Sequence, residues 1–415
     1  MMGEPLIYDW NQVGGANAEF SRPRWIELND ETLRDGLQSP SVRQPSIEEK
    51  ENFLRLLPTL GIGAANLGYP GASAAAFADV VRMAQLIDRE HLSIRPNCAG
   101  RTHQADIEPI LRASQASGVP IDAALFVGSS AIRQWVEDWD QASLLHVIDT
   151  AIKTASEEGL SVMFVTEDTT RARPEDVEAM YVAAATAGAT RFCVSDTVGH
   201  ATPVGTQRII QFVIQSLVKH GFDAVVDWHG HRDRGLDVVN ALAALAAGAS
   251  RVHGCALGIG ERVGNTPMDT TLVNLVLLGW MDQDLTTLPE YCRLAAAMTG
   301  TAVPPNYPVV GADAFSTSTG VHAAAVAKAF AKGNPGLADA VYSAVPAGLV
   351  GRRQEILVGP MSGRSNVEYW LSHHGLESNP ERVQAILDVA KTTRQVLTEH
   401  QIQQVLESLA VPPGA

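Results

Sequence analysis

The chain has 415 residues, of which 46% are hydrophobic and 19% are charged, and its formal net charge is −15. This length suits one large domain with a smaller one, and the composition is typical of a folded globular protein rather than a disordered chain. The excess of 46 acidic over 31 basic residues disfavours a general nucleic-acid binder, which normally carries a basic patch. The negative net charge does not exclude small anionic substrates, because local clusters of arginine can bind them.

The N-terminus and the cysteines both indicate a cytoplasmic protein. The first residues lack the basic and apolar segments of a secretory signal, and no apolar run reaches the roughly 18 to 20 residues that a membrane span requires. The four cysteines form no Cys-x-x-Cys pair, and so few scattered thiols fit a reducing compartment. We therefore predict a cytoplasmic location, with no membrane partner and no nucleic-acid partner.

In chain order, eight short apolar or β-branched runs alternate with segments of helical periodicity. Ala- and Leu-rich stretches such as 175–187 and 237–247 have the helical period, and Gly61, Gly188 and Gly248 each end a helix before the next strand. The eight predicted strands lie near residues 25–29, 63–67, 92–97, 121–127, 161–166, 191–195, 224–228 and 251–256.

This alternation predicts an α/β fold with a parallel sheet. Eight strand–helix units over residues 23–282 predict a (β/α)8 TIM barrel, for which ~250 residues is typical. A doubly wound open sheet is the competing architecture, but no Gly-x-Gly-x-x-Gly follows the first strand. Residues 1–22 are then an N-terminal arm, and residues 283–415 are a C-terminal linker with smaller, mainly helical subdomains.

Polar residues follow many of the predicted strands rather than one switch point, which also favours the barrel. In such a fold the carboxyl ends of all strands share one rim, where active sites form. The polar residues at these ends are Arg34, Asp35, Gln38, Asn66, Asn97, Arg101, Ser129, Ser130, Arg133, Glu167, Asp168, Asp196, Thr197, His229 and His231, followed by the loop 258–265.

The strongest signal on this rim is a candidate metal site. His229 and His231 are two residues apart on one strand, so their side chains share a face, and Asp35 can add a carboxylate. Oxygen and imidazole ligands without a thiolate fit Mg²⁺, Mn²⁺ or Zn²⁺. The alternatives are two half-buried histidines and, for Asp35, a helix N-cap. Asn265 is placed to complete the oxygen ligands.

Two further groups fit carbonyl chemistry beside such an ion. Arg34 is a candidate for stabilising a developing enolate or oxyanion, although it could be a surface residue at the start of a loop. Glu167 is a candidate for proton transfer, although with Asp168 it could form a solvated acidic pair. As a phosphate cradle, the glycine-rich stretch 258–264 is only a weak signal.

Four motifs together resemble the acyl-CoA-dependent, metal-dependent synthases and lyases, whose best-known synthases make 2-isopropylmalate, citramalate and homocitrate. The resemblance covers roughly residues 25–370, and the glycine-rich loop is similar to that of the synthases rather than the hydroxymethylglutaryl-CoA lyases, whose loop carries a catalytic cysteine. The motifs are Glu31-Thr-Leu-Arg-Asp-Gly-Leu-Gln38, Ser195-Asp-Thr-Val-Gly-His200, His229-x-His231 and Gly258-Ile-Gly-Glu-Arg-Val-Gly-Asn265, with Gly320-Val-His322 and Ser362-Gly-Arg364 further on.

This resemblance implies a Claisen-type acyltransferase that condenses acetyl-CoA with a 2-oxo acid at a divalent metal and releases CoA. The implied metal ligands are Asp35, His229 and His231, with Asn265 nearby. The implied catalytic residues are Arg34, Glu167 and His322, the last of which could reach over from a partner subunit of a homodimer. The implied substrate-binding residues are Gln38, Arg101, Arg133 and Thr197.

Our first expectation for the reaction is 2-isopropylmalate synthase, a step of leucine biosynthesis. Arg133 lies where homocitrate synthases carry an arginine for a second carboxylate, so an acidic 2-oxo acid is the close alternative, and a hydroxyacyl-CoA lyase is a third. Departures from the family pattern at Asn66, Arg232, Thr317 and Ala324 leave the 2-oxo acid open. The chain leaves no room for the regulatory domain of many isopropylmalate synthases, so we expect no leucine feedback of that kind.

Overall fold

The computed structural model describes residues 6–8, 22–333 and 335–410, so most of the predicted N-terminal arm lies outside the described residues. The chain divides into two compact units. The first comprises residues 1–283 and 291–301, and the second comprises residues 284–290 and 302–415. Within the described residues, no helix is long and apolar enough to cross a membrane.

The first unit is a closed barrel of eight parallel strands, which confirms the predicted (β/α)8 fold. Each strand pairs with the next along the chain, and β1 closes the barrel against β8 through four aligned residue pairs from Glu27–Arg251 to Asp30–Gly254. The strands are β1 (Glu27–Asp30), β2 (Ala64–Asn66), β3 (Arg95–Arg101), β4 (Asp122–Gly128), β5 (Val162–Glu167), β6 (Arg191–Asp196), β7 (Val226–Gly230) and β8 (Arg251–Gly254).

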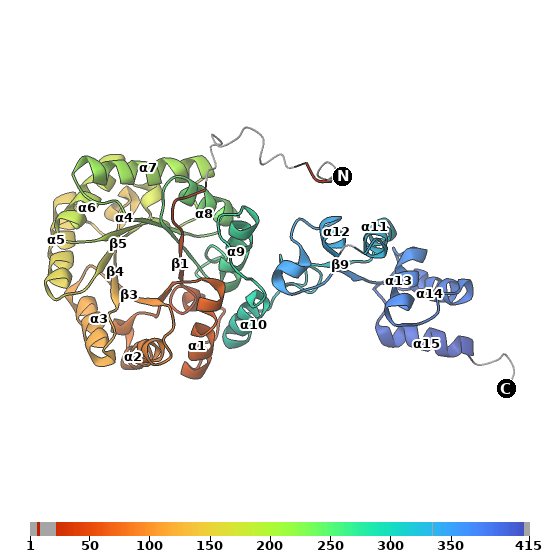
Figure 1. Ribbon diagram of the computed structural model, residues 1–415. Helices are drawn as coiled ribbons and strands as arrows, with labels where there is room; N and C mark the ends of the chain where they lie inside the picture. The colour runs from red at the N-terminus through yellow and green to blue at the C-terminus, as the bar shows by residue number, and fades with distance from the viewer. Residues whose placement is uncertain (1–5, 9–21, 334, 411–415) are drawn as a thin grey trace. The chain divides into compact units, whose positions relative to one another are not determined.

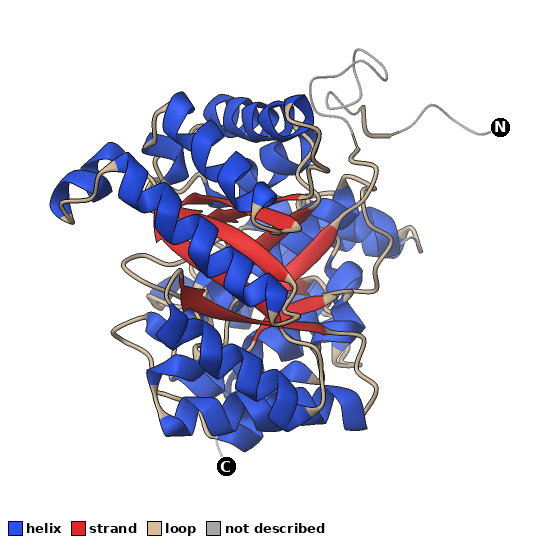
Figure 2. Cartoon of the chain, turned by 90° about the vertical axis from the view of Figure 1, so that its left-hand side faces the viewer, coloured by secondary structure: helices blue, strands red, loops and turns tan. Residues whose placement is uncertain are grey.

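A ring of helices surrounds this barrel, as the view along its axis shows (Figure 1). In the view turned by 90°, the strands lie inside the helical layer (Figure 2). The helices are α1 (Ile47–Leu54), α2 (Ala74–Arg89), α3 (Gln104–Ser117), α4 (Ala131–Val136), α5 (Gln141–Glu157), α6 (Pro174–Thr186), α7 (Pro203–Lys219), α8 (Asp237–Ala246), α9 (Met268–Leu277) and α10 (Leu288–Thr299). Short 3-10 turns are η3 (Gly36–Gln38), η4 (Leu57–Leu60), η5 (Pro70–Ala72), η6 (Thr169–Arg171) and η7 (Ala256–Gly258).

Local capping explains where several of these helices begin. Ser46 and Glu49 form a capping box at the start of α1, and the side chains of Ser73, Asp140 and Thr202 accept backbone N–H groups at the starts of α2, α5 and α7. These caps satisfy N–H groups that have no partner inside the helix, so each helix starts at a defined residue.

Polar side chains lie in the interior of the barrel. Asn97 on β3 donates to Asn29 on β1 at 2.7 Å, and Arg251 on β8 reaches Met163 on β5 at 3.2 Å. Both contacts join strands that are not neighbours, so these side chains point into the barrel. The sequence placed Asn97 and Arg101 after the third strand, and this was wrong, because β3 continues to Arg101 and contains both residues.

The second unit is mainly helical. Its core is a cluster of apolar residues from the last helices, including Val367, Leu371, Ile386 and Ile402. A two-stranded parallel sheet also belongs to this unit, and the sequence did not predict it. The elements are β9 (Ser316–Thr317), α11 (Gly320–Ala331), α12 (Pro335–Ala340), η8 (Ala347–Val350), β10 (Glu355–Ile356), α13 (Arg364–His373), α14 (Pro380–Thr392) and α15 (Glu399–Ala410).

Candidate metal centre and active site

Asp35, His229 and His231 meet at the carboxyl-end rim of the barrel. Asp35 Oδ2 lies 3.1 Å from His229 Nε2 and 3.9 Å from His231 Nε2, and the two Nε2 atoms are 3.4 Å apart. Ligand atoms that share one cation at about 2.1 Å are separated by about 3 Å, so this spacing is that of a ligand set. All three residues are buried, and their ligand atoms all lie within 4.8 Å of one another.

The side chain of Asp35 is used at this site and not as a helix cap. Asp35 precedes η3, but its carboxylate makes no capping hydrogen bond there. Burial opposes its ionisation, but Arg34 and the two imidazoles outweigh burial and hold the pKa of Asp35 well below its usual range. Burial, together with the neighbouring His229, lowers the pKa of His231 to about 4. An anionic carboxylate beside a neutral imidazole is the protonation state that a metal ion requires.

Asn265 lies beside the histidines and has an unused oxygen. The backbone of Asn265 pairs with that of His231 in an isolated antiparallel bridge. The side-chain Nδ2 of Asn265 donates to the carbonyl oxygen of Ile259 at 3.1 Å. Its Oδ1 is buried and has no hydrogen-bond partner among the described residues. A buried acceptor without a donor is costly unless something fills it. The residues present therefore fit a divalent ion with mixed nitrogen and oxygen ligands.

Arg34 is held against the site by Glu31. Its Nε and Nη2 both donate to Glu31 Oε2, at 2.9 and 2.5 Å, and its Nη1 lies 3.4 Å from Asp35 Oδ2. Glu31 is buried, and its other oxygen accepts from Asn29 at 2.7 Å. Burial opposes the ionisation of Glu31, but Arg34 and His253 keep its pKa below the usual range. The guanidinium is thereby fixed in one orientation beside the candidate metal ligands.

A buried charged network, not predicted from the sequence, lies next to the candidate metal ligands. His253 on β8 has Nδ1 3.3 Å from Glu31 Oε1 and Nε2 3.1 Å from Asp227 Oδ2. Arg251 and Arg191 hold the same Asp227 at 2.7 Å each. Period-two alternation could have found part of it, since residues 227 and 229 share one strand face, as do 251 and 253.

Glu167 ends β5, and Arg133 lies in α4, the short helix that follows β4. Arg133 Nη2 is 3.8 Å from Glu167 Oε2, and its Nη1 is 3.1 Å from Glu137. Burial raises the pKa of Glu167, although Arg133 counteracts this. A carboxylate with a raised pKa is suited to accept a proton near neutral pH.

Thr197 follows β6 and is linked to the neighbouring loop. Its Oγ1 accepts the backbone N–H of Asp168 at 2.8 Å, and Arg262 donates to its carbonyl oxygen at 2.5 Å. The same Arg262 is paired with Asp233 at 2.9 Å. Thr197 therefore lies where three rim loops meet, and its hydroxyl donates no hydrogen bond to any of the described residues.

The other predicted site residues lie elsewhere or are already engaged. Arg101 is bound to Asp106 through Nε at 2.7 Å and Nη2 at 3.0 Å, and Gln38 is exposed at the end of η3. His322 belongs to the second unit, where its ring stacks on Tyr342 with centroids 4.0 Å apart. Tyr342 was not among the residues predicted from the sequence. Arg101, Arg133 and Glu167 together line an open, mainly apolar pocket of about 370 Å³.

Comparison with known proteins identifies relatives of this chain. A protein of Ignicoccus hospitalis named "Probable 2-isopropylmalate synthase" is 31% identical over 394 residues, which cover 93% of each chain. Homocitrate synthase AksA of Methanocaldococcus jannaschii is 30% identical over 393 residues, covering 92% of this chain and 91% of that protein. The crystal structure of the HMG-CoA lyase from Brucella melitensis matches the fold with a TM-score of 0.55, at 18% identity over 66% of this chain and 99% of that one.

The family model described as HMGL-like matches residues 25–295, which span the whole barrel and every candidate metal ligand. The chain therefore belongs to the HMGL-like family.

Proposed function

We propose that this protein is a metal-dependent acyltransferase that condenses acetyl-CoA with a 2-oxo acid and releases CoA when water hydrolyses the thioester of the condensed product, with 2-oxoisovalerate as substrate and 2-isopropylmalate as product. The convergence of Asp35, His229 and His231 carries the proposal. Relatives at about 30% identity are named as synthases of this kind, which supports the reaction class. The cytoplasmic location and the place in leucine biosynthesis remain predictions.

The residues have distinct tasks in this reaction. A bound divalent ion supplies Lewis-acid polarisation of the 2-oxo acid. Arg34, fixed by Glu31, places a positive charge where negative charge develops on oxygen. The acetyl methyl group is a very weak acid, so a positioned base is required, and Glu167 with its raised pKa takes the proton. The hydroxyl of Thr197 donates to the carboxylate of the 2-oxo acid.

One observation favours a second substrate class. Arg133 lies on the pocket that Glu167 also lines, and a guanidinium suits a second carboxylate. Its present partners, Glu137 and Glu167, are half-exposed and can be replaced by a ligand. A dicarboxylic 2-oxo acid such as 2-oxoglutarate is therefore the competing substrate.

The test is release of free thiol from acetyl-CoA with Mg²⁺ or Mn²⁺ across 2-oxoisovalerate, pyruvate, 2-oxoglutarate and oxaloacetate. We expect one acid to support release, a chelator to abolish it, and Asp35→Ala to abolish it as well. His220→Gln, at the end of α7, is the matched control and should retain full activity. Silence of the metal-loaded protein with all four acids would exclude the synthase reaction on them.

We also propose a homodimer in which His322 acts with the barrel of the partner subunit. An equimolar mixture of Asp35→Ala and His322→Ala proteins tests this, because a site with an intact barrel and an intact His322 can then form across the dimer. Recovery of activity after mixing two inactive variants is the expected result. Sedimentation as a monomer, or no recovery from a mixed dimer, would contradict the shared site.

A further inference from the structure

The loop between β8 and α9 contains two residues in a strained backbone conformation. Leu257 and Arg262 have φ +57° and +55°, in the left-handed region that residues other than glycine rarely adopt. Such a conformation persists only where the surrounding structure holds it in place. Leu257 is buried, so packing can hold it, whereas Arg262 lies in the exposed tip of the loop, residues 261–263. Contacts other than burial must therefore hold Arg262.

The side chain of Arg262 fastens this tip to two neighbouring loops. Its Nε and Nη2 donate to the two carboxylate oxygens of Asp233, in the loop after β7, at 2.9 and 3.0 Å. Its Nη2 also donates to the carbonyl oxygen of Thr197, in the loop after β6, at 2.5 Å. The adjacent Val263 is exposed and offers no polar group. The attachment of the tip therefore depends on the guanidinium of Arg262.

The rest of this three-loop assembly is held by the backbone. The N–H of Asn265 donates to the carbonyl oxygen of Gly258 at 3.0 Å and closes the base of the loop. The loops after β6 and β7 lie against each other, because a side chain at Gly199 would come within 2.8 Å of the backbone nitrogen of Asp233. Loss of the Arg262 side chain should therefore loosen the tip and leave the base of the loop in place.

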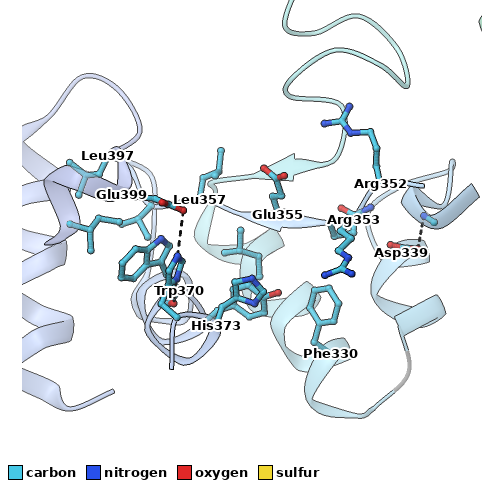
Figure 3. A pocket seen from close by; sticks show the side chains of 17 residues that line it. Phe330, Asp339, Arg352, Arg353, Glu355, Leu357, Trp370, His373, Leu397 and Glu399 are labelled. Atoms are coloured by element: carbon cyan, nitrogen blue, oxygen red, sulfur yellow. Dashed lines mark hydrogen bonds and ion pairs between the residues drawn. The ribbon is translucent and has the colours of Figure 1, made fainter. Parts of the chain in front are cut away.

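The pair of Arg262 and Asp233 is more ordered than a typical surface ion pair. In the cavity of the second unit that Figure 3 shows, Glu399 is 74% exposed and meets His374 through one contact of 3.4 Å. An exposed pair of that kind contributes little. The side chains of Arg262 and Asp233 are 39% and 27% exposed and share two parallel hydrogen bonds, which fix the orientation of the guanidinium. The third bond, to Thr197, uses this fixed orientation.

We propose that Arg262 is a positioning residue, whose pairing with Asp233 holds Thr197 in place to bind the carboxylate of the 2-oxo acid. This role rests on the proposed function, in which the hydroxyl of Thr197 makes that contact. Arg262 acts through the carbonyl group of Thr197 and does not itself touch the substrate. Without its side chain the 2-oxo acid meets a less ordered partner and binds more weakly.

Steady-state kinetics of Arg262→Ala test this role. We expect the KM for the 2-oxo acid to rise about tenfold, while the KM for acetyl-CoA and the affinity for Mn²⁺ stay unchanged. Arg55→Ala is the matched control, because Arg55 is similarly exposed and pairs with Glu90 through two bonds of 2.7 and 2.8 Å. It should leave both KM values unchanged. An unchanged KM for the 2-oxo acid in Arg262→Ala would overturn the proposal.

A double-mutant cycle tests whether Arg262 and Asp233 act as a unit. Asp233→Ala should raise the KM for the 2-oxo acid, and adding it to Arg262→Ala should raise that KM no further, because the pair is already broken. Effects that multiply in the double variant would show that the two residues act independently and would contradict the proposed pairing.

Hydrogen exchange separates the role of Arg262 from the reaction. The N–H of Gly264 donates to the carbonyl oxygen of Glu261 at 2.9 Å, and the N–H of Asp168 donates to Thr197 Oγ1 at 2.8 Å, so these two amides report on the loop tip and on Thr197. Both should exchange about tenfold faster in Arg262→Ala than in the unaltered protein. Equal exchange in the two proteins would overturn the role of Arg262, whereas absence of thiol release by the unaltered protein with all four acids would refute the proposed function.

Discussion

Arg34 donates two of its N–H groups to one oxygen of Glu31, at 2.9 and 2.5 Å, so that only Nη1 is left facing Asp35. This pairing fixes an arginine that would otherwise choose among many rotamers at the rim. Glu31 in turn is held from below by Asn29 and His253. The orientation of the proposed oxyanion-stabilising group therefore depends on residues that never reach the substrate.

Glu31→Gln tests this dependence. An amide of the same shape keeps the packing but loses the charge that binds Arg34, and we expect kcat to fall by about 10- to 100-fold, as for other groups that orient an active site. Steady-state kinetics with the preferred 2-oxo acid measure the effect, and circular dichroism checks the fold. The control is Glu368→Gln, which changes an exposed carboxylate paired with Arg364 and should leave kcat unchanged. An unchanged kcat in Glu31→Gln would show that Arg34 needs no such support.

The sequence predicted the barrel and the candidate metal ligands for the same physical reason. Alternating apolar runs specify strands, and parallel strands bring their carboxyl ends to one rim whatever their exact register. Asp35 and His229 could therefore be placed together without knowing any side-chain contact. The strand ends were less certain, because a polar residue such as Asn97 inside a barrel looks like the end of a strand.

The buried network could not be predicted in the same way. Whether His253 lies between Glu31 and Asp227 depends on the register of β8 against its neighbours and on side chains that cross the interior. Arg101 shows the same limit, because its partner Asp106 comes from the helix that follows. The ring contact of His322 with Tyr342 is likewise a tertiary fact that spacing does not reveal.

Asp30 should make stability depend on pH. Burial raises its pKa to about 6 from 3.8, although Tyr291 donates to it at 2.6 Å. As the pH rises from about 4 to about 6, the unfolded chain loses this proton while the folded chain keeps it, so the unfolded state binds fewer protons and stability falls, by on the order of 3 kcal/mol. Asp30→Asn cannot ionise and should lack this component.

Urea unfolding measures the free energy of unfolding of the unaltered protein and of Asp30→Asn. The measurements cover about pH 4.5 to 7, a range set by the two pKa values of Asp30. As the pH rises, the free energy of unfolding of Asp30→Asn should increase relative to that of the unaltered protein. Asp149→Asn, an exposed carboxylate on α5, should show no such gain. Parallel curves for Asp30→Asn would mean that Asp30 is ionised in the folded protein throughout.

Two substitutions should move the pKa of Glu167 in opposite directions. Arg133 lowers this pKa and Glu137 raises it, against a background in which burial raises it most. If Glu167 is the base, activity appears as the pH rises through its pKa. The acidic limb of kcat/KM should then shift to higher pH in Arg133→Ala and to lower pH in Glu137→Gln. A limb that stays in place in both variants would assign the proton transfer to another group.

Gly260→Ala should weaken metal binding through Asn265. Gly260 has φ +150°, a conformation that side chains rarely adopt, and a methyl group there would overlap Asn265 Nδ2. The side-chain amide of Asn265 must then move, and its Oδ1 moves with it. We expect Mn²⁺ affinity, measured by calorimetry, to fall by about 10- to 100-fold. Gly159→Ala separates strain from overlap, because Gly159 has φ +86° with no atom within 4 Å of the added carbon. It should lose some stability and no metal affinity, whereas unchanged Mn²⁺ binding in a folded Gly260→Ala protein would remove Asn265 from the ligand set.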